Sequence, residues 1–389
     1  MKIFVPNQTD AQETRAAMVP AVAKKLASGG HELLIESGAG LMSGHTDDAY
    51  RSAGARIAGP EGWSEGEMVL VVRSPTQEQV GRMRNGAVLI GMLSPHRNRE
   101  LIDQLARQGV ASMALEYLPR ITRAQAMDVL SSQANLAGFK AVVIAAEKSP
   151  KIFPMLMTAA GTIQPARVFV IGAGVAGLQA IATARRLGAV VTAYDVRPAV
   201  KEQVQSVGAK FLELPLETKD AQDQGGYAKE LSPEQQQKQR EMMAKAIVES
   251  DVVITTAAIP GKPAPKLIPG DVVEKMQPGS VIVDLAAESG GNCELTEPGQ
   301  IVQKHNVTIV GITNLPATVP FHASQVYANN IANLLKLLFT KEGQLKIDPS
   351  DEVIAGVLLT QNGQVVHPRL KPAEATVSPE KAKELVTNA

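Results

Sequence analysis

The stretch RVFVIGAGVAGLQAIATARR, Arg167–Arg186, decides the fold of this chain. It begins with an apolar strand, passes through three glycines spaced as G-x-G-x-x-G, and ends in a run rich in Ala and Leu that is typical of a helix. Gly172 permits a tight turn, Gly174 lets the backbone approach a pyrophosphate, and Gly177 lets the helix pack closely on the strand. The N–H groups that open the helix, beginning at Val175, then face the phosphates. This order of strand, turn and helix predicts a dinucleotide-binding site.

A second strand indicates which dinucleotide is bound. The strand-like run from Ala189 to Tyr194 ends in Asp195, where a carboxylate binds the ribose hydroxyls. At about 4 Å and an effective dielectric constant near 20, this carboxylate opposes each unit of charge on a 2′-phosphate by about 4 kcal/mol. Arg197 is the opposing feature, because an arginine there can accommodate a 2′-phosphate. Asp195 holds the strand-end position, so we predict NAD(H) in preference to NADP(H).

Composition excludes several classes of protein. Lys+Arg and Asp+Glu number 39 each, which leaves no basic surface for nucleic acid or an anionic membrane. Cys293 is the only cysteine, so no intrachain disulfide forms and a reducing compartment is indicated. The N-terminus lacks the apolar core of a signal peptide. The longest uncharged run, Val168–Ala184, belongs to the nucleotide fold rather than to a bilayer, and we expect no other segment to approach a membrane span. No cluster has metal-ligand spacing, so no metal is predicted.

The order of apolar runs predicts the architecture. Strand-like runs alternate with helical stretches in both halves of the 389-residue chain, which is long enough for two domains. The runs are KIFV, ELLIE, MVLVV, AVLIG and SMALE in the first half, and AVVTAYDV, KFLEL, VVITT, SVIVDL and TIVGI after the glycine turn. We predict two α/β, Rossmann-like, doubly wound parallel-sheet domains with a cleft between them. A helix over Ser324–Leu338 returns to the first domain, giving residues 1–127 plus 321–389 and residues 128–320.

A polar stripe precedes the glycine turn. Thr122 and Gln125 have the spacing of a capping box, which predicts a helix that starts there. Polar residues then recur at three- and four-residue spacing: Gln125, Asp128, Ser131 or Ser132, and Asn135. A solvated helix face is one interpretation. The other is a nicotinamide site, because the stripe carries amides, hydroxyls and one carboxylate instead of Lys and Glu.

Groups for proton transfer are scarce. A dehydrogenase acting on an alcohol or amino acid moves a proton with the hydride, and His96 is the strongest candidate among the histidines. Hydride transfer between two nicotinamide rings needs no acid or base and depends on proximity and orientation. The long polar interruption at Glu217–Gln239 is either a disordered linker or a mobile lid in which Tyr227 contacts the nucleotide.

Several segments resemble domain I of proton-translocating nicotinamide nucleotide transhydrogenase: PRITRAQAMDVLSSQANLAG, the segment around GAGVAG, GGYAKE, ITTAAIPGKPAP and DLAAESGGNCE. The resemblance covers nearly the whole chain. It implies a homodimeric, NAD(H)-binding component that passes hydride between NADH and NADP⁺, with NADP(H) held on a partner subunit and the exchange coupled to proton movement through a membrane-spanning subunit. It also implies a cytoplasmic protein, peripheral on the inner face of the membrane through its partners. Because no membrane helices follow the domain here, we expect a separate subunit.

The resemblance also implies roles for individual residues. Gln125 is expected to reach toward the partner's nucleotide, while Arg120, Asp128 and Ser131 hold the nicotinamide ring and carboxamide. The pyrophosphate and adenosine-ribose site, with the tyrosine of the family's mobile loop, matches Gly172, Gly174, Val175, Gly177, Asp195, Arg197 and Tyr227.

Alanine dehydrogenase is the alternative, since it is a relative with the same two-domain plan. Its arginine matches Arg15. Its substrate lysine falls on Arg73, which does not deprotonate at useful pH, and its catalytic histidine falls on Met92. A nucleotide-sensing module without catalysis is a third class, which leaves the polar stripe unexplained.

Overall fold

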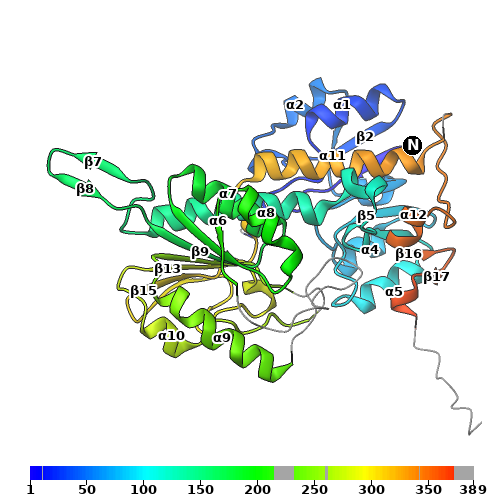
Figure 1. Ribbon diagram of the computed structural model, residues 1–389. Helices are drawn as coiled ribbons and strands as arrows, with labels where there is room; N and C mark the ends of the chain where they lie inside the picture. Colours follow the sequence, from blue (N-terminus) through cyan, green and yellow to red (C-terminus); the bar gives the residue numbers. More distant parts are fainter. Residues whose placement is uncertain (11, 214–231, 259–261, 341, 372–389) are drawn as a thin grey trace, which may run out of the picture. The chain divides into compact units, whose positions relative to one another are not determined.

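The computed structural model describes residues 1–10, 12–213, 232–258, 262–340 and 342–371. The chain forms two compact units (Figure 1). Unit 1 consists of Met1–Gln8, Ala16–Asp128 and the described residues from Ala328 onward. Unit 2 consists of Thr9–Arg15 and Val129–Tyr327. Each unit contains its own sheet, so each is described separately.

Unit 1 is built on an eight-stranded sheet in the order β17-β16-β6-β5-β4-β1-β2-β3. Its strands are β1 (Lys2–Val5), β2 (Glu32–Glu36), β3 (Arg56–Ala58), β4 (Met68–Leu70), β5 (Val88–Gly91), β6 (Ala111–Ala114), β16 (Leu358–Gln361) and β17 (Gln364–Val365). Strands β1 to β6 pair in parallel, while β16 pairs antiparallel with β6 and β17.

The helices of unit 1 cover its sheet because the strands are apolar on both faces. They are α1 (Pro20–Ser28), α2 (Asp47–Ser52), α3 (Gly62–Glu65), α4 (Gln77–Arg82), α5 (Arg99–Arg107), α12 (Glu352–Val357) and the C-terminal part of α11 (Pro320–Leu338). On one face, strand residues such as Phe4 and Val69 pack with Trp63 of α3, Val80 of α4 and Leu105 of α5.

Unit 2 contains a seven-stranded sheet in the order β11-β10-β9-β12-β13-β15-β14. Its strands are β9 (Arg167–Ile171), β10 (Val190–Tyr194), β11 (Lys210–Phe211), β12 (Val252–Thr255), β13 (Val281–Asp284), β14 (Ile301–Lys304) and β15 (Val307–Val310). All neighbouring pairs are parallel except β14 with β15. The six parallel strands follow the doubly wound order 3-2-1-4-5-6, so the predicted α/β, Rossmann-like class is confirmed.

Helices pack on both faces of the unit 2 sheet. Alternate residues of β9 point to opposite sides, as strand geometry requires. Val168 and Val170 face the core formed with α6 (Val129–Lys148), α7 (Val175–Arg186) and α8 (Lys201–Ser206). Phe169 and Ile171 face α9 (Pro233–Val248) and α10 (Gly270–Glu274). Because α9 begins at Pro233, the last segment of the predicted linker or lid, Glu217–Gln239, is helical instead.

Several short strands were missed by the sequence patterns. Strand β3 forms one edge of the unit 1 sheet, β16 with β17 extends the other edge, and β14 forms an edge of the unit 2 sheet. Strands β7 (Leu156–Thr158) and β8 (Gly161–Ile163) form a separate hairpin that projects from unit 2 (Figure 1). Such short segments contain too few residues for alternation to be recognised.

Helix α6 corrects the expectation that no segment beyond Val168–Ala184 approaches a membrane span. Among the helices that the structure describes, α6 alone is long and apolar enough to cross a membrane by length and composition. Its apolar residues form part of the unit 2 core, where Ala141, Val142 and Ala145 pack with residues of α7. Its hydropathy is therefore explained by packing.

Candidate functional site

The glycine turn of unit 2 has the backbone that a phosphate-binding turn requires. Gly172 has φ +96°, a conformation that side chains of L-residues disfavour. A Cβ on Gly177 would lie 1.9 Å from the carbonyl oxygen of Gly172, so only glycine fits there. A Cβ on Gly174 would meet no protein atom within 4 Å. Gly174 caps α7, whose first residue is Val175, and the space in front of this helix end is open to a ligand.

Asp195 follows β10 and is held against the turn. One carboxylate oxygen, Oδ2, accepts a hydrogen bond from the N–H of Ala173 at 2.7 Å. Arg197 binds the same carboxylate, from its backbone N–H and Nε to Oδ1 at 2.9 and 2.8 Å, and from Nη2 to Oδ2 at 2.7 Å. The pair is largely buried, with exposed side-chain fractions of 4% for Asp195 and 15% for Arg197. The positive charge of Arg197 is thus offset by its own neighbour.

Thr256 was not predicted as part of the site. It follows β12, the strand beside β9 at which the strand order reverses, and this reversal is where ligands bind in doubly wound sheets. Its hydroxyl donates to the Gly172 carbonyl at 3.1 Å, and its Oγ1 lies 2.5 Å from the position of a Cβ on Gly172. Thr256 therefore fixes the turn. A hydroxyl directly after the fourth strand was the available signal.

Helix α6 runs parallel to α7 and extends past its N-terminus. Near the start of α7, a Cβ on Gly138 would lie 2.1 Å from the carbonyl oxygen of Ala176. Beyond the other end of both helices, Pro154 lies against Gly188, where a Cβ would be 2.8 Å from the proline Cα. Ser131 precedes Gly138 by seven residues, which is two helical turns, so both lie on the α6 face directed toward α7. Ser131 thus lies on the glycine-turn side of unit 2.

Arg120, Gln125 and Asp128 belong to unit 1, and the predicted capping box is wrong. Residues Thr122–Met127 form a 3-10 helix, η3, whose N-cap is Ile121 and which has no side-chain cap. Thr122 is therefore the first helical residue and not the cap. Arg120 and Gln125 are exposed, and Asp128 is partly buried.

The polar stripe does not lie on one continuous helix. Asp128 is extended, with φ −72° and ψ 93°, and α6 starts after it. The carbonyl of Ala126 would accept from the N–H of Leu130 in an α-helix. It accepts instead from Nδ2 of Asn330 and Asn333 at 2.9 and 3.1 Å. These two amides of α11 compensate for the broken helix, which separates Gln125 from Ser131.

The residues that would serve a dehydrogenase are engaged elsewhere. In unit 2, Arg15 donates to both carboxylate oxygens of Glu13 at 2.8 and 2.7 Å and to Oε1 of Gln133 at 2.9 Å. Arg15 and Glu13 are buried, with exposed side-chain fractions of 6% and 3%. In unit 1, the Arg73 guanidinium donates to the backbone carbonyl of Gln8, and His96 contacts the Tyr117 hydroxyl at 3.0 Å. Tyr227 lies outside the described residues.

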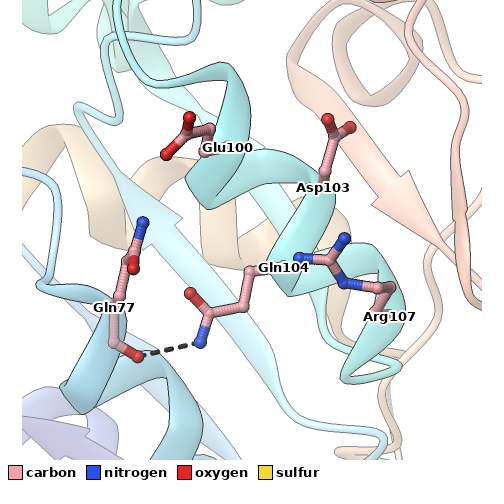
Figure 2. Close-up of a pocket in the computed structure, with 5 residues that line it drawn as sticks. All are labelled: Gln77, Glu100, Asp103, Gln104 and Arg107. Atoms are coloured by element: carbon pink, nitrogen blue, oxygen red, sulfur yellow. Dashed lines mark hydrogen bonds between the residues drawn. The ribbon is translucent and has the colours of Figure 1, made fainter.

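Other reactive groups give no alternative centre. Cys293 is fully buried, and burial raises the pKa of its thiol to about 11. No group of three His, Cys, Asp or Glu suited to a metal occurs within the described ranges. A hollow of about 390 Å³ in unit 1 is lined by Gln77, Glu100, Asp103, Gln104 and Arg107. Figure 2 shows these side chains on α4 and α5, with Gln104 donating to the Gln77 carbonyl at 2.8 Å. The hollow is polar and contains none of the predicted residues.

Comparison with known proteins identifies the family. Residues 4–137 match the N-terminal domain model of alanine dehydrogenase/PNT, and residues 141–368 match the C-terminal domain model. The chain belongs to the alanine dehydrogenase/PNT family. The glycine turn described above is accordingly the NAD-binding element of a dehydrogenase-type Rossmann-like fold.

Within this family the chain is more similar to transhydrogenase components than to alanine dehydrogenase. It is 48% identical to an NAD(P) transhydrogenase subunit alpha chain of Rhodospirillum rubrum, over 95% of this chain and 99% of that protein. A crystal structure of transhydrogenase from Sinorhizobium meliloti is 44% identical, covers 94% of this chain and 100% of its own, and superimposes with a TM-score of 0.86. Alanine dehydrogenase of Bacillus subtilis is 31% identical over 94% of this chain and 93% of its own.

Proposed function

We propose that this protein is the NAD(H)-binding component of a proton-translocating transhydrogenase. It passes hydride between NADH bound on this chain and NADP⁺ bound on a partner subunit. A membrane-spanning subunit couples this exchange to proton translocation, and the protein lies on the cytoplasmic face of the membrane through its partners. The similarity to transhydrogenase subunits over nearly the whole chain supports this function.

The residues of the glycine turn fit NAD(H). The pyrophosphate takes the open space in front of Gly174 and Val175, where the α7 N–H groups point. The ribose hydroxyls donate to Asp195. A carboxylate has about four acceptor positions, and all four are used by Ala173 and Arg197. The hydroxyls therefore replace guanidinium N–H groups, whereas a 2′-phosphate would bring negative charge to a buried carboxylate.

The observation that carries the choice of reaction is the buried pair of Arg15 and Glu13. An amino-acid dehydrogenase needs a cation directed at the substrate carboxylate and a group that takes up a proton. Arg15 is the only one of the three alanine dehydrogenase positions that matches, and its guanidinium is already saturated by Glu13 and Gln133. Arg73 and Met92 supply no acid or base. Ring-to-ring hydride transfer requires neither group.

We assign the remaining residues to orientation of the reacting rings. Arg120, Asp128 and Ser131 hold the nicotinamide and its carboxamide, and Gln125 reaches toward the partner's nucleotide. Their hydrogen bonds fix the distance and angle between the two rings, which is the main requirement for a transfer without proton exchange. Tyr227 closes over the bound nucleotide.

The experiment is isotope transfer. The protein is mixed with its NADP(H)-binding partner, with NADH labelled by deuterium at C4 and with NADP⁺. We expect deuterium in the NADPH and none lost to solvent, and no turnover of NADH with pyruvate and ammonia. Replacing Gln125 with Asn should slow transfer while leaving NADH affinity near that of the unmodified protein. Solvent hydrogen in the product, or activity with pyruvate and ammonia, would contradict the proposed function.

We further propose that the protein is a homodimer in which the β7–β8 hairpin contacts the second copy. A two-stranded hairpin is marginally stable alone in water, and this one carries exposed apolar side chains. Met157 is 80% exposed and Leu156 46%. A second copy of the chain covers these side chains in the proposed dimer.

Light scattering tests the dimer. The unmodified protein should have twice the mass of one chain, and Met157→Glu should shift the equilibrium toward monomer because a charge would enter an apolar contact. Leu41→Glu is the matched control, because Leu41 is 63% exposed on unit 1 and outside the hairpin. A monomeric unmodified protein refutes the dimer, and a Met157→Glu variant that stays dimeric refutes the hairpin contact.

A further inference from the structure

The N-terminal turns of α6 form a wall beside the open end of the glycine turn. Gly138 touches α7 at Ala176, the second residue of that helix, and the two helices are parallel. The ten residues from Val129 to Gly138 therefore lie at or beyond the N-terminal end of α7. The contact at Gly138 is backbone to backbone, so it fixes how closely this wall approaches the turn.

Helix geometry gives the height of each residue along the wall. Asn135 precedes Gly138 by three residues, which is about 4.5 Å along the α6 axis. Gly174 precedes Ala176 by two residues, which is about 3 Å. Asn135 is therefore level with the space directly in front of Gly174. Ser131 lies about 6 Å farther from α7 than Asn135.

Asn135 has suitable chemistry and exposure for a ligand in this space. At three residues from Gly138 it lies on the same side of α6, and helical side chains lean toward the helix N-terminus, which here is beyond the turn. Asn135 is exposed. Its amide offers two N–H donors, and the segment VLSSQANLAG from Val129 to Gly138 contains no carboxylate that would repel an anion.

We propose that Asn135 is a further cofactor-binding residue, donating its side-chain N–H to the pyrophosphate of the dinucleotide from the side opposite the α7 N-terminus. The pyrophosphate is thus held between α7 and α6, and the Gly138 contact sets the width of this groove. Ser131, farther along α6, faces the nicotinamide half. This inference rests on the proposed binding of NAD(H) at the glycine turn.

Binding of three ligands tests the assignment. The affinities of the full chain for NADH, ADP-ribose and adenosine are measured by calorimetry for the unmodified protein, Asn135→Ala and Asn135→Asp. A hydrogen bond to a charged group is worth roughly tenfold in affinity, so Asn135→Ala should weaken NADH and ADP-ribose by about that factor. Asn135→Asp should weaken both further, because its carboxylate repels the phosphates. Adenosine, which lacks phosphate, should bind all three proteins equally.

Lys148→Gln is the matched control. It changes the net charge by the same amount as Asn135→Asp, on the same helix, but near the end remote from the turn. It should leave all three affinities and the thermal unfolding midpoint unchanged. Asn135→Asp should likewise keep the unfolding midpoint, because the side chain is exposed.

Each other outcome refutes a defined statement. If the unmodified protein binds NADH but Asn135→Asp binds ADP-ribose equally well, the Asn135 contact is refuted and the proposed function stands. Loss of NADH affinity alone refutes the pyrophosphate assignment, because it places Asn135 at the nicotinamide. Loss of adenosine affinity also refutes it, because the change then reaches the adenosine site. An unmodified protein that binds neither NADH nor ADP-ribose refutes the proposed function together with this inference.

Discussion

Replacing Gly177 with Ala is expected to lower the stability of the protein by about 3 kcal/mol and its affinity for NADH by about a hundredfold. The new Cβ would lie 1.9 Å from the carbonyl oxygen of Gly172 and 2.8 Å from its carbonyl carbon. Both are backbone atoms, so no side-chain rotation relieves the clash. The turn and α7 must move apart, which misaligns the N–H groups that face the pyrophosphate. Urea unfolding and calorimetric titration with NADH measure the two effects.

Gly174→Ala is the matched variant of the same turn. Its φ of −75° is accessible to alanine, and its Cβ would meet no protein atom within 4 Å. Stability should therefore stay unchanged, while NADH affinity falls because the methyl group occupies the approach of the pyrophosphate. A Gly177→Ala protein with unaltered unfolding, or a Gly174→Ala protein that binds NADH normally, would contradict this account of the turn.

Glu13→Ala is expected to destabilise the protein by about 3–5 kcal/mol, because it leaves the Arg15 charge buried without its partner. Glu13 accepts two hydrogen bonds from the Arg15 side chain and one from Nδ2 of Asn314 at 3.2 Å. Both charged side chains are at least nine-tenths buried. Water cannot replace these bonds without opening unit 2. The free energy of unfolding in urea is the measurement.

Two variants define the origin of this effect. Asp271→Ala removes the exposed ion pair with Lys275, which is 2.9 Å long, and should cause no measurable change because solvent screens it. The double variant Glu13→Leu with Arg15→Met should recover most of the lost stability, because it removes both buried charges and keeps the volume. Equal destabilisation by Glu13→Ala and by the double variant would show that packing, and not the unpaired charge, dominates.

The sequence predicted most of the parallel strands because each of these is a short, continuous apolar run buried on both faces. It predicted the glycine turn because the roles of Gly172 and Gly177 depend on local backbone geometry. The break at Asp128 was not predictable from spacing. It depends on Asn330 and Asn333, which are remote in sequence and bond the carbonyl of Ala126. A local capping pattern does not reveal such a competing partner.

The role of α6 was also beyond sequence patterns. Gly138 in an apolar helix predicts only a modest loss of helix propensity. Its consequence depends on Ala176 of α7 lying against it, which is a tertiary contact. In the same way, the sequence placed Asp195 and Arg197 near one ribose, but it did not show that the arginine already binds the carboxylate.

The environment of Cys293 has a practical consequence for labelling. The thiol is fully buried and its pKa is raised to about 11, so almost none of it is thiolate at neutral pH. Maleimide reagents should leave the folded protein unmodified. A cysteine introduced at an exposed position, such as Met157 of the hairpin, would then be the single point of attachment. A fluorophore placed there can report on hairpin contacts without first removing the native cysteine.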